Sequence, residues 1–182
     1  MFRADIIEKC KQNDRKAQLK LYNQYCNGML IVAKRFVKDT MEAEDVVQEA
    51  FIKAFAKLEQ YKAEVTFGAW LKRIVINKSI DVLKTKKERL MDIEDVQLKI
   101  VDTAEDDWSV EENVTIDDVK FAIEQLPEKY KYVVMLYLIE GYDHQEISEI
   151  LNISEVASRT QLSRGKQKLK ALLKLEKNGT ES

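Results

Sequence analysis

The sequence is poor in residues that interrupt regular structure. Its 182 residues include one proline and five glycines. Sandwiches and barrels need many residues at turn-specific backbone angles, so this scarcity argues against an all-β fold. A glycine-rich loop that would cradle a phosphate is also missing. We therefore predict an all-α protein.

Groups for catalysis and metal binding are equally scarce. His144 is the only histidine, and the two cysteines, Cys10 and Cys26, lie sixteen positions apart with no CxxC motif. This set cannot supply four zinc ligands without carboxylates. The cysteine pattern is typical of two reduced thiols in a cytosolic protein. We predict no enzymatic activity, no cofactor and no metal, and we expect His144 to be exposed and without a chemical role.

Long apolar runs are missing as well. No stretch of about 18 apolar residues is present, as a transmembrane helix would require. The first residues lack the apolar core of a signal peptide. We expect no membrane insertion and a cytoplasmic location.

Charge is abundant, and it is divided into three blocks. Residues 1–90 carry 19 Lys and Arg against 12 Asp and Glu, residues 91–128 carry 2 against 13, and residues 129–182 carry 9 against 7. The acidic block also lacks a helical apolar stripe, which is typical of an extended linker. We predict two helical domains, 1–90 and 117–182, joined by an acidic linker over 91–116. Two basic regions indicate a polyanionic ligand held at two places, although solvated faces show the same pattern.

A helix is predicted from Asp39, which with Glu42 has the form of a capping box, to about Leu58. One face of this helix gathers apolar residues for the core: Val47, Ala50, Phe51, Ala54 and Leu58. The opposite face carries Asp45, Gln48, Glu49 and Ile52. An isoleucine among acidic and polar side chains favours a protein-docking surface, and a solvated face with one stray apolar residue is the alternative.

Aromatic residues and a basic helix come next. Tyr61 and Phe67 flank a loop, and Thr66 is placed to cap a helix over 67–88. A basic and polar stripe recurs along this helix at Arg73, Asn77 and Lys84. Rings that stack on unpaired bases, beside cations that follow phosphates, are typical of single-strand nucleic acid binding. Phe67 and Trp70 can also be interpreted as ordinary core anchors.

The second domain carries a helix-turn-helix pattern. Asp143 with Glu146 opens a short helix, Asn152 supplies a tight turn, and Ser154 caps a basic second helix. The expected core residues are Ile147, Ile150, Leu151, Ile153 and Leu162. The second helix of such a motif enters the major groove of DNA. Its first turns would present Glu155, Ser158, Arg159, Gln161 and Arg164, and Lys166 and Lys168 would contact backbone phosphates further along.

Taken together, three segments resemble a bacterial sigma factor of the extracytoplasmic-function (ECF) group, within the sigma-70 family. The segments are EAEDVVQEAFIKAF, FGAWLKRIVINKSIDVLK and LPEKYKYVVMLYLIEGYDHQEISEILNIS, the last followed by a basic helix. The resemblance covers about residues 19–88 and 120–173. It implies a transcription initiation factor that binds core RNA polymerase, directs it to specific promoters, and recognises and helps to melt promoter DNA.

The resemblance also implies a role for each segment. Docking on the clamp helices of core RNA polymerase would use Asp45, Gln48, Glu49, Phe51 and Ile52. The melted minus-ten element would be held by Tyr61, Phe67, Trp70, Arg73, Asn77 and Lys84. The minus-thirty-five element would be read by Ser154, Glu155, Ser158, Arg159, Gln161, Arg164, Lys166 and Lys168. Such sigma factors are commonly held by an anti-sigma factor that masks both domains.

The recognition helix departs from the family pattern. Where the family commonly reads Gly-Thr-Val-Lys-Ser-Arg, this chain has Val156-Ala157-Ser158-Arg159-Thr160-Gln161, so base preferences do not carry over. Two other interpretations remain open at this point. A stand-alone helix-turn-helix repressor or activator needs no polymerase-binding face, and a helical adaptor would bind only proteins. Neither would confer initiation on core polymerase.

Overall fold

The computed structural model describes residues 2–90 and 114–179, with side chains over 5–86 and 114–174. Every regular element in these ranges is a helix, and no strand occurs in them. The all-α prediction is confirmed. Most of the predicted acidic linker, 91–116, lies outside the described residues.

The chain divides into two compact units, Met1–Glu94 and Asp95–Ser182, which we call unit 1 and unit 2. Among the described residues, no helix combines the length and the apolar character that a membrane span requires. Cys10 is buried, Cys26 is half-buried, and neither is in a disulfide.

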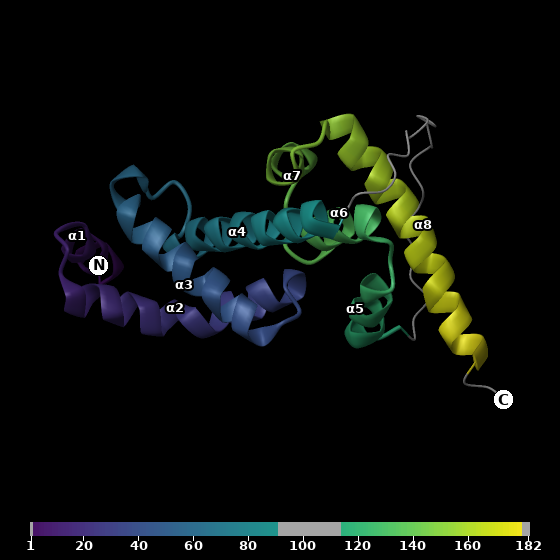
Figure 1. Ribbon diagram of the computed structural model, residues 1–182, viewed down its shortest axis with the longest axis horizontal. Helices are drawn as coiled ribbons and strands as arrows, with labels where there is room; N and C mark the ends of the chain where they lie inside the picture. Colours follow the sequence, from purple (N-terminus) through teal and green to yellow (C-terminus); the bar gives the residue numbers. More distant parts are fainter. Residues whose placement is uncertain (1, 91–113, 180–182) are drawn as a thin grey trace. The chain divides into compact units, whose positions relative to one another are not determined.

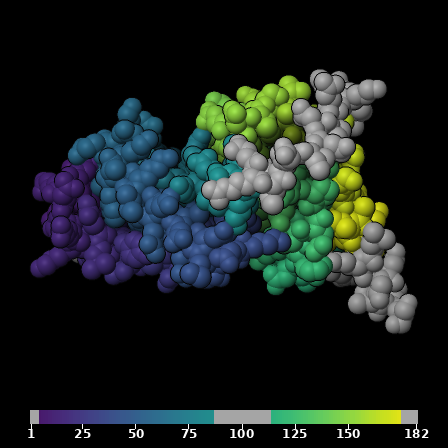
Figure 2. Space-filling view, viewed as in Figure 1, coloured from purple at the N-terminus to yellow at the C-terminus, as the bar shows by residue number. Residues whose placement is uncertain are grey.

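Unit 1 contains α1 (Phe2–Lys11), α2 (Arg15–Phe36), α3 (Thr40–Ala56), a 3₁₀ turn η1 (Leu58–Gln60) and α4 (Phe67–Leu90) (Figure 1). Helices α2, α3 and α4 each pack against the other two, and α1 packs on α2 and η1. The space-filling view shows side chains closing the gaps between these ribbons (Figure 2). The unit therefore has one core shared by three long helices.

Helix α3 buries the face that its periodicity predicts. Val47, Ala50, Phe51 and Ala54 are at most 3% exposed, and Leu58 is buried in η1 after α3 has ended at Ala56. Asp39 caps α3 by accepting the Glu42 N–H at 3.0 Å.

Only this half of the predicted capping box is seen for α3. The Glu42 carboxylate forms an ion pair with Lys86 of α4. An acidic side chain at this position is therefore used to hold two helices of unit 1 together.

Unit 2 contains α5 (Ile116–Glu124), α6 (Glu128–Leu138), α7 (His144–Leu151) and α8 (Glu155–Gly179). The long α8 packs against the other three helices (Figure 1). Asp143 and Glu146 form the expected reciprocal capping box, and Asn152 adopts φ 56° in the turn. The Ser154 Oγ accepts the Ala157 N–H at 3.0 Å. The local signals that predict this helix-turn-helix are confirmed.

The core of the helix-turn-helix is smaller than predicted. Ile147, Ile150 and Leu162 are buried, but Leu151 and Ile153 are only half-buried. Helix α6 adds a large part of the remaining core, since its Val133, Val134, Met135 and Leu136 are at most 1% exposed.

Helices α6 and α8 cross at Gly165. A Cβ atom at this position would lie 2.5 Å from the Cγ2 of Val134 and 3.3 Å from the Cβ of Tyr130. Real Cβ atoms do not approach other carbons so closely, so glycine is required for the two helices to meet at this distance. The crossing sets where the first turns of α8 lie on unit 2.

Candidate functional sites

The exposed face of α3 carries an unusual mixture of side chains. Ile52 is 69% exposed, and Asp45, Gln48 and Glu49 are exposed beside it. Met41, 75% exposed, extends the same stripe because positions 41, 45, 48 and 52 follow helical spacing. We call this set, Met41, Asp45, Gln48, Glu49 and Ile52, the α3 surface. Met41 is not among the residues predicted for this surface, although its spacing from Asp45 indicates it.

Phe51 does not belong to this surface. It is 2% exposed, and its ring packs at 4.7 Å from that of Tyr22 and at 5.9 Å from that of Phe55. Its assignment as a polymerase contact is therefore wrong: the ring faces the core on the opposite side of α3.

The α3 surface borders a shallow groove. Its volume is about 200 Å³, and it lies between α2 and α3 with Gln48 and Glu44 on one wall and Cys26 and Asn27 on the other. On the far side, Glu49 forms an ion pair with Lys78 of α4. The exposed stripe thus has a groove on one side and an ion pair to α4 on the other, and the buried face of α3 holds the helix in place.

The aromatic residues after η1 form a cluster. Centroids of the Tyr61 ring lie 5.8 Å from Phe67 and 5.3 Å from Trp70, and Phe67 lies 5.4 Å from Tyr25 of α2. The Tyr61 hydroxyl donates to the Val65 carbonyl at 2.7 Å, which closes the loop. Burial, and to a lesser extent Tyr25, raise the pKa of Tyr61, so the hydroxyl keeps this proton.

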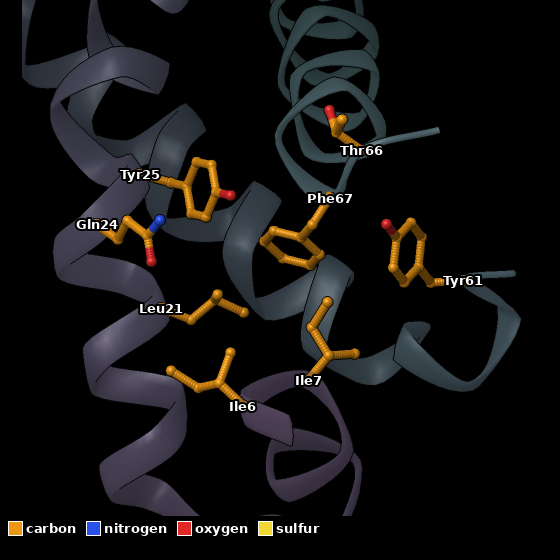
Figure 3. Close-up of a pocket in the computed structure, with 8 residues that line it drawn as sticks. All are labelled: Ile6, Ile7, Leu21, Gln24, Tyr25, Tyr61, Thr66 and Phe67. Carbon is orange, nitrogen blue, oxygen red and sulfur yellow. The ribbon is translucent and has the colours of Figure 1, made fainter. Parts of the chain in front are cut away.

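A cavity of about 120 Å³ adjoins this cluster. Figure 3 shows Phe67 between Tyr25 and Tyr61, with Ile6 and Ile7 of α1 below it. Phe67 is only 5% exposed and is therefore a wall of the unit 1 core. Its predicted direct contact with a DNA base is not available in this structure, whereas Tyr61 and Trp70 are half-buried with part of each ring open.

The basic stripe of α4 lies beside this cluster. Thr66 caps the helix as predicted, accepting the Ala69 N–H at 3.2 Å. Arg73 and Asn77 are half-buried, and Lys84 is exposed. The stripe is interrupted by Ile80, which is buried. The three polar residues therefore lie along the margin of the core.

The first turns of α8 present a mixed surface. Glu155 and Arg159 are exposed and joined by an ion pair of 3.4 Å, and Ser154 is exposed at the cap. Val156 is 59% exposed on the same turns. Val156 is not among the residues predicted to face DNA, although helical spacing places it opposite the buried side of α8. Gln161 and Arg164 are half-buried.

Ser158 is not on this surface. It is fully buried, and its Oγ lies 2.8 Å from Nδ1 of His144 in the first turn of α7. The prediction that Ser158 faces DNA is therefore wrong. The expectation of an exposed His144 is wrong as well, because its ring is half-buried and stacks on Tyr137 at 5.1 Å.

Two of the predicted phosphate contacts also touch α6. The Nζ of Lys166 lies 5.4 Å from the centre of the Tyr137 ring, and that of Lys168 lies 6.0 Å from the centre of the Tyr130 ring. Such cation–π contacts hold a lysine stem against the helix while the ammonium stays near water. Both lysines are positioned by α6.

Both units match known protein families. The family Sigma-70 region 2 matches residues 21–89, and the family Sigma-70, region 4 matches residues 116–169. The chain is 30% identical over 176 residues to the ECF RNA polymerase sigma-E factor of Haemophilus influenzae, covering 89% of this chain and 90% of that protein. The chain belongs to the ECF group of the sigma-70 family. The sigma factor is also 29% identical over 177 residues to the ECF RNA polymerase sigma factor SigW of Bacillus subtilis, with 92% and 95% of the two chains covered.

The fold of the sigma factor is similar to a solved structure. The TM-score is 0.56 with 20% identity to the sigma factor RpoE of Bartonella quintana, covering 85% of this chain and 95% of that chain. That protein was solved in complex with the anti-sigma factor NepR. Because both sigma regions are present in order, the chain is a transcription initiation factor that directs RNA polymerase to promoters. The matches to both sigma regions favour this function over a stand-alone repressor and over a helical adaptor.

Proposed function

We propose that the α3 surface is where this sigma factor docks on core RNA polymerase. The observation that carries this proposal is the exposed stripe itself, in which Met41 and Ile52 lie at either end of Asp45 and Gln48. Apolar anchors beside complementary charges are typical of protein interfaces. The groove next to Gln48 gives the partner a place for one side chain.

The second part of the proposal concerns DNA. Unit 1 would hold the melted minus-ten strand with the open sides of Tyr61 and Trp70 stacked on bases and with Arg73, Asn77 and Lys84 along the phosphates. Unit 2 would read the minus-thirty-five element with Ser154, Glu155, Val156 and Arg159, and Gln161, Arg164, Lys166 and Lys168 would contribute affinity. Val156 adds an apolar side chain of the kind that contacts a thymine methyl group.

The proposal includes no catalysis by this chain. Nucleotide addition belongs to the polymerase, and the sigma factor contributes promoter choice and strand separation. We infer that it acts in the cytoplasm, where polymerase and chromosome are found, and that an anti-sigma factor binds it, since its structural relative was solved with one. We also propose that units 1 and 2 act as separate domains over 1–90 and 117–182, joined by the acidic segment.

A double substitution on α3 tests the docking surface. Asp45→Arg with Gln48→Ala reverses a charge and removes an amide from an exposed face, leaving the core of α3 intact. If these side chains meet the polymerase, losing a desolvated charged contact costs about 2–5 kcal/mol, or at least about thirtyfold in affinity. Binding is measured by titrating labelled sigma factor with core polymerase.

The matched control makes the same chemical changes elsewhere on unit 1. Asp5→Arg with Gln12→Ala alters two exposed positions of α1 and the turn after it, outside the α3 surface. Asp5 loses only an exposed ion pair with Lys9, and we expect wild-type affinity. Equal affinity for wild type and the α3 variant would show that polymerase binds another surface.

A further inference from the structure

His144 lies where three helices of unit 2 meet. Its Nδ1 is 2.8 Å from the Oγ of buried Ser158 on α8, and its ring is stacked on Tyr137 of α6 with 27° between the planes. Lys166 of α8 also lies near Tyr137, with its Nζ 5.4 Å from the ring centre. The imidazole is therefore in direct contact with α8, the helix that we propose binds DNA.

The contacts of His144 suit both of its protonation states. A serine hydroxyl donates to a neutral imidazole nitrogen and accepts from a protonated one, so the Ser158 contact survives either way. The Tyr137 ring favours a cation stacked on it. This chain thus has a protein-bound imidazole that can gain a proton without loss of its hydrogen bond.

The charges around His144 come from two helices. On its own helix the N-cap Asp143 is adjacent, and α8 contributes Glu155, Arg159 and Lys166. Burial is the largest influence and lowers the pKa of His144, and Arg159 and Lys166 lower it further. Asp143 and Glu155 act in the opposite direction. In the free protein the neutral imidazole is therefore favoured near neutral pH.

We propose that His144 takes up a proton when unit 2 binds duplex DNA. This inference rests on the proposed role of α8 in DNA binding. Phosphates that approach Arg159 and Lys166 neutralise the two cations that disfavour a charged imidazole, and they add a negative potential of their own. The imidazolium thereby becomes the favoured form in the complex.

The consequence is a pH-dependent affinity. If the complex binds one more proton than the free protein, the association constant rises as the pH falls, by at most about tenfold per pH unit. The effect is confined to the interval between the pKa of His144 in the free protein and its higher pKa in the complex. No other histidine is present in the chain to obscure it.

The direct test follows this single imidazole by NMR. The Cε1–H resonance of the full-length protein is titrated from about pH 8 to about pH 5.5, the range in which histidine ionises, with and without a short duplex of arbitrary sequence at low salt. An arbitrary duplex suffices because phosphate contacts dominate such binding. We expect a higher midpoint with DNA. An equal or lower midpoint with DNA bound would overturn the proposal.

A variant tests the same linkage through affinity. His144→Gln keeps a side chain that can bond to Ser158 but removes the titration. Wild type should bind the duplex more tightly as the pH falls, and His144→Gln should lack that gain. A pH dependence equal to that of wild type would overturn the proposal while leaving DNA binding by unit 2 intact. If wild type binds no duplex at any pH, both this inference and the role of α8 in DNA binding fail.

Discussion

Gly165→Ala is the substitution that most directly tests how α8 is seated. Its new Cβ would lie 2.5 Å from the Cγ2 of Val134, which is fully buried. Valine in a helix has one strongly preferred rotamer, so its methyl groups cannot turn away at low cost. One helix must therefore move by several tenths of an ångström.

Two opposing effects determine the free energy of unfolding of the Gly165→Ala variant. Alanine is favoured over glycine inside a helix by about 1 kcal/mol. Overpacking a well-filled core costs about 1–3 kcal/mol. We expect a net loss of about 1 kcal/mol. In a Val134→Ala background the clashing methyl is absent and the 3.3 Å approach to the Cβ of Tyr130 remains. The same substitution should then stabilise unit 2, by at most about 1 kcal/mol.

Hydrogen exchange of the α6 amides measures this sign change, because it reports the opening of unit 2 separately from unit 1. The four proteins are wild type, the two single variants and the double variant, compared as a double-mutant cycle. Stabilisation by Gly165→Ala in the wild-type background, or an equal loss in both backgrounds, would refute the close crossing.

Three further predictions concern charges in unit 2. Glu124→Ala should destabilise the unit by more than Lys131→Met does, as measured by the same hydrogen exchange. The Lys131 side chain is only 8% exposed and pairs with Glu124 at 2.6 Å, and a buried cation without its partner is costly. Glu155→Gln should strengthen binding to a duplex of arbitrary sequence, measured by titration at low salt. The substitution removes a negative charge and the ion pair with Arg159. Without DNA, the free energy of unfolding of unit 2 should fall as the pH drops through about 6.5. In the unfolded state His144 binds a proton at this pH, whereas in the folded state its pKa is lowered. His144→Gln should remove this part of the pH profile.

Local signals in the sequence predicted the helix ends well. Asp143 with Glu146, Asn152 and Ser154 each act through backbone groups within four residues. The buried face of α3 was also predictable, because it depends only on helical periodicity. These features need no knowledge of the partner helix.

The errors arose where a distant residue decides the environment. Ser158 is a small polar residue of the kind usually found at the surface, but it is buried and lies 2.8 Å from His144, fourteen residues earlier. Phe67 sits next to a loop and was taken as a base-stacking candidate, but Tyr25 of α2 encloses it. Glu49 stays on the α3 surface, but its ion pair with Lys78 of α4 could not be predicted from the spacing along α3. Such pairings depend on tertiary packing that spacing along one helix does not contain.

Transcription by core polymerase from a supercoiled library of promoter fragments is the measurement that tests the central claim most directly. Wild-type protein should produce defined transcripts that core polymerase alone does not, and the selected promoters should share upstream and downstream elements. The Asp45→Arg, Gln48→Ala variant should yield none of them, and Arg159→Ala should relax the preference at the upstream element, at a cost of about 1–3 kcal/mol. Transcripts from the α3 variant at wild-type levels, or no initiation by wild type above core polymerase alone, would contradict the assignment of docking to α3 and of promoter reading to α8.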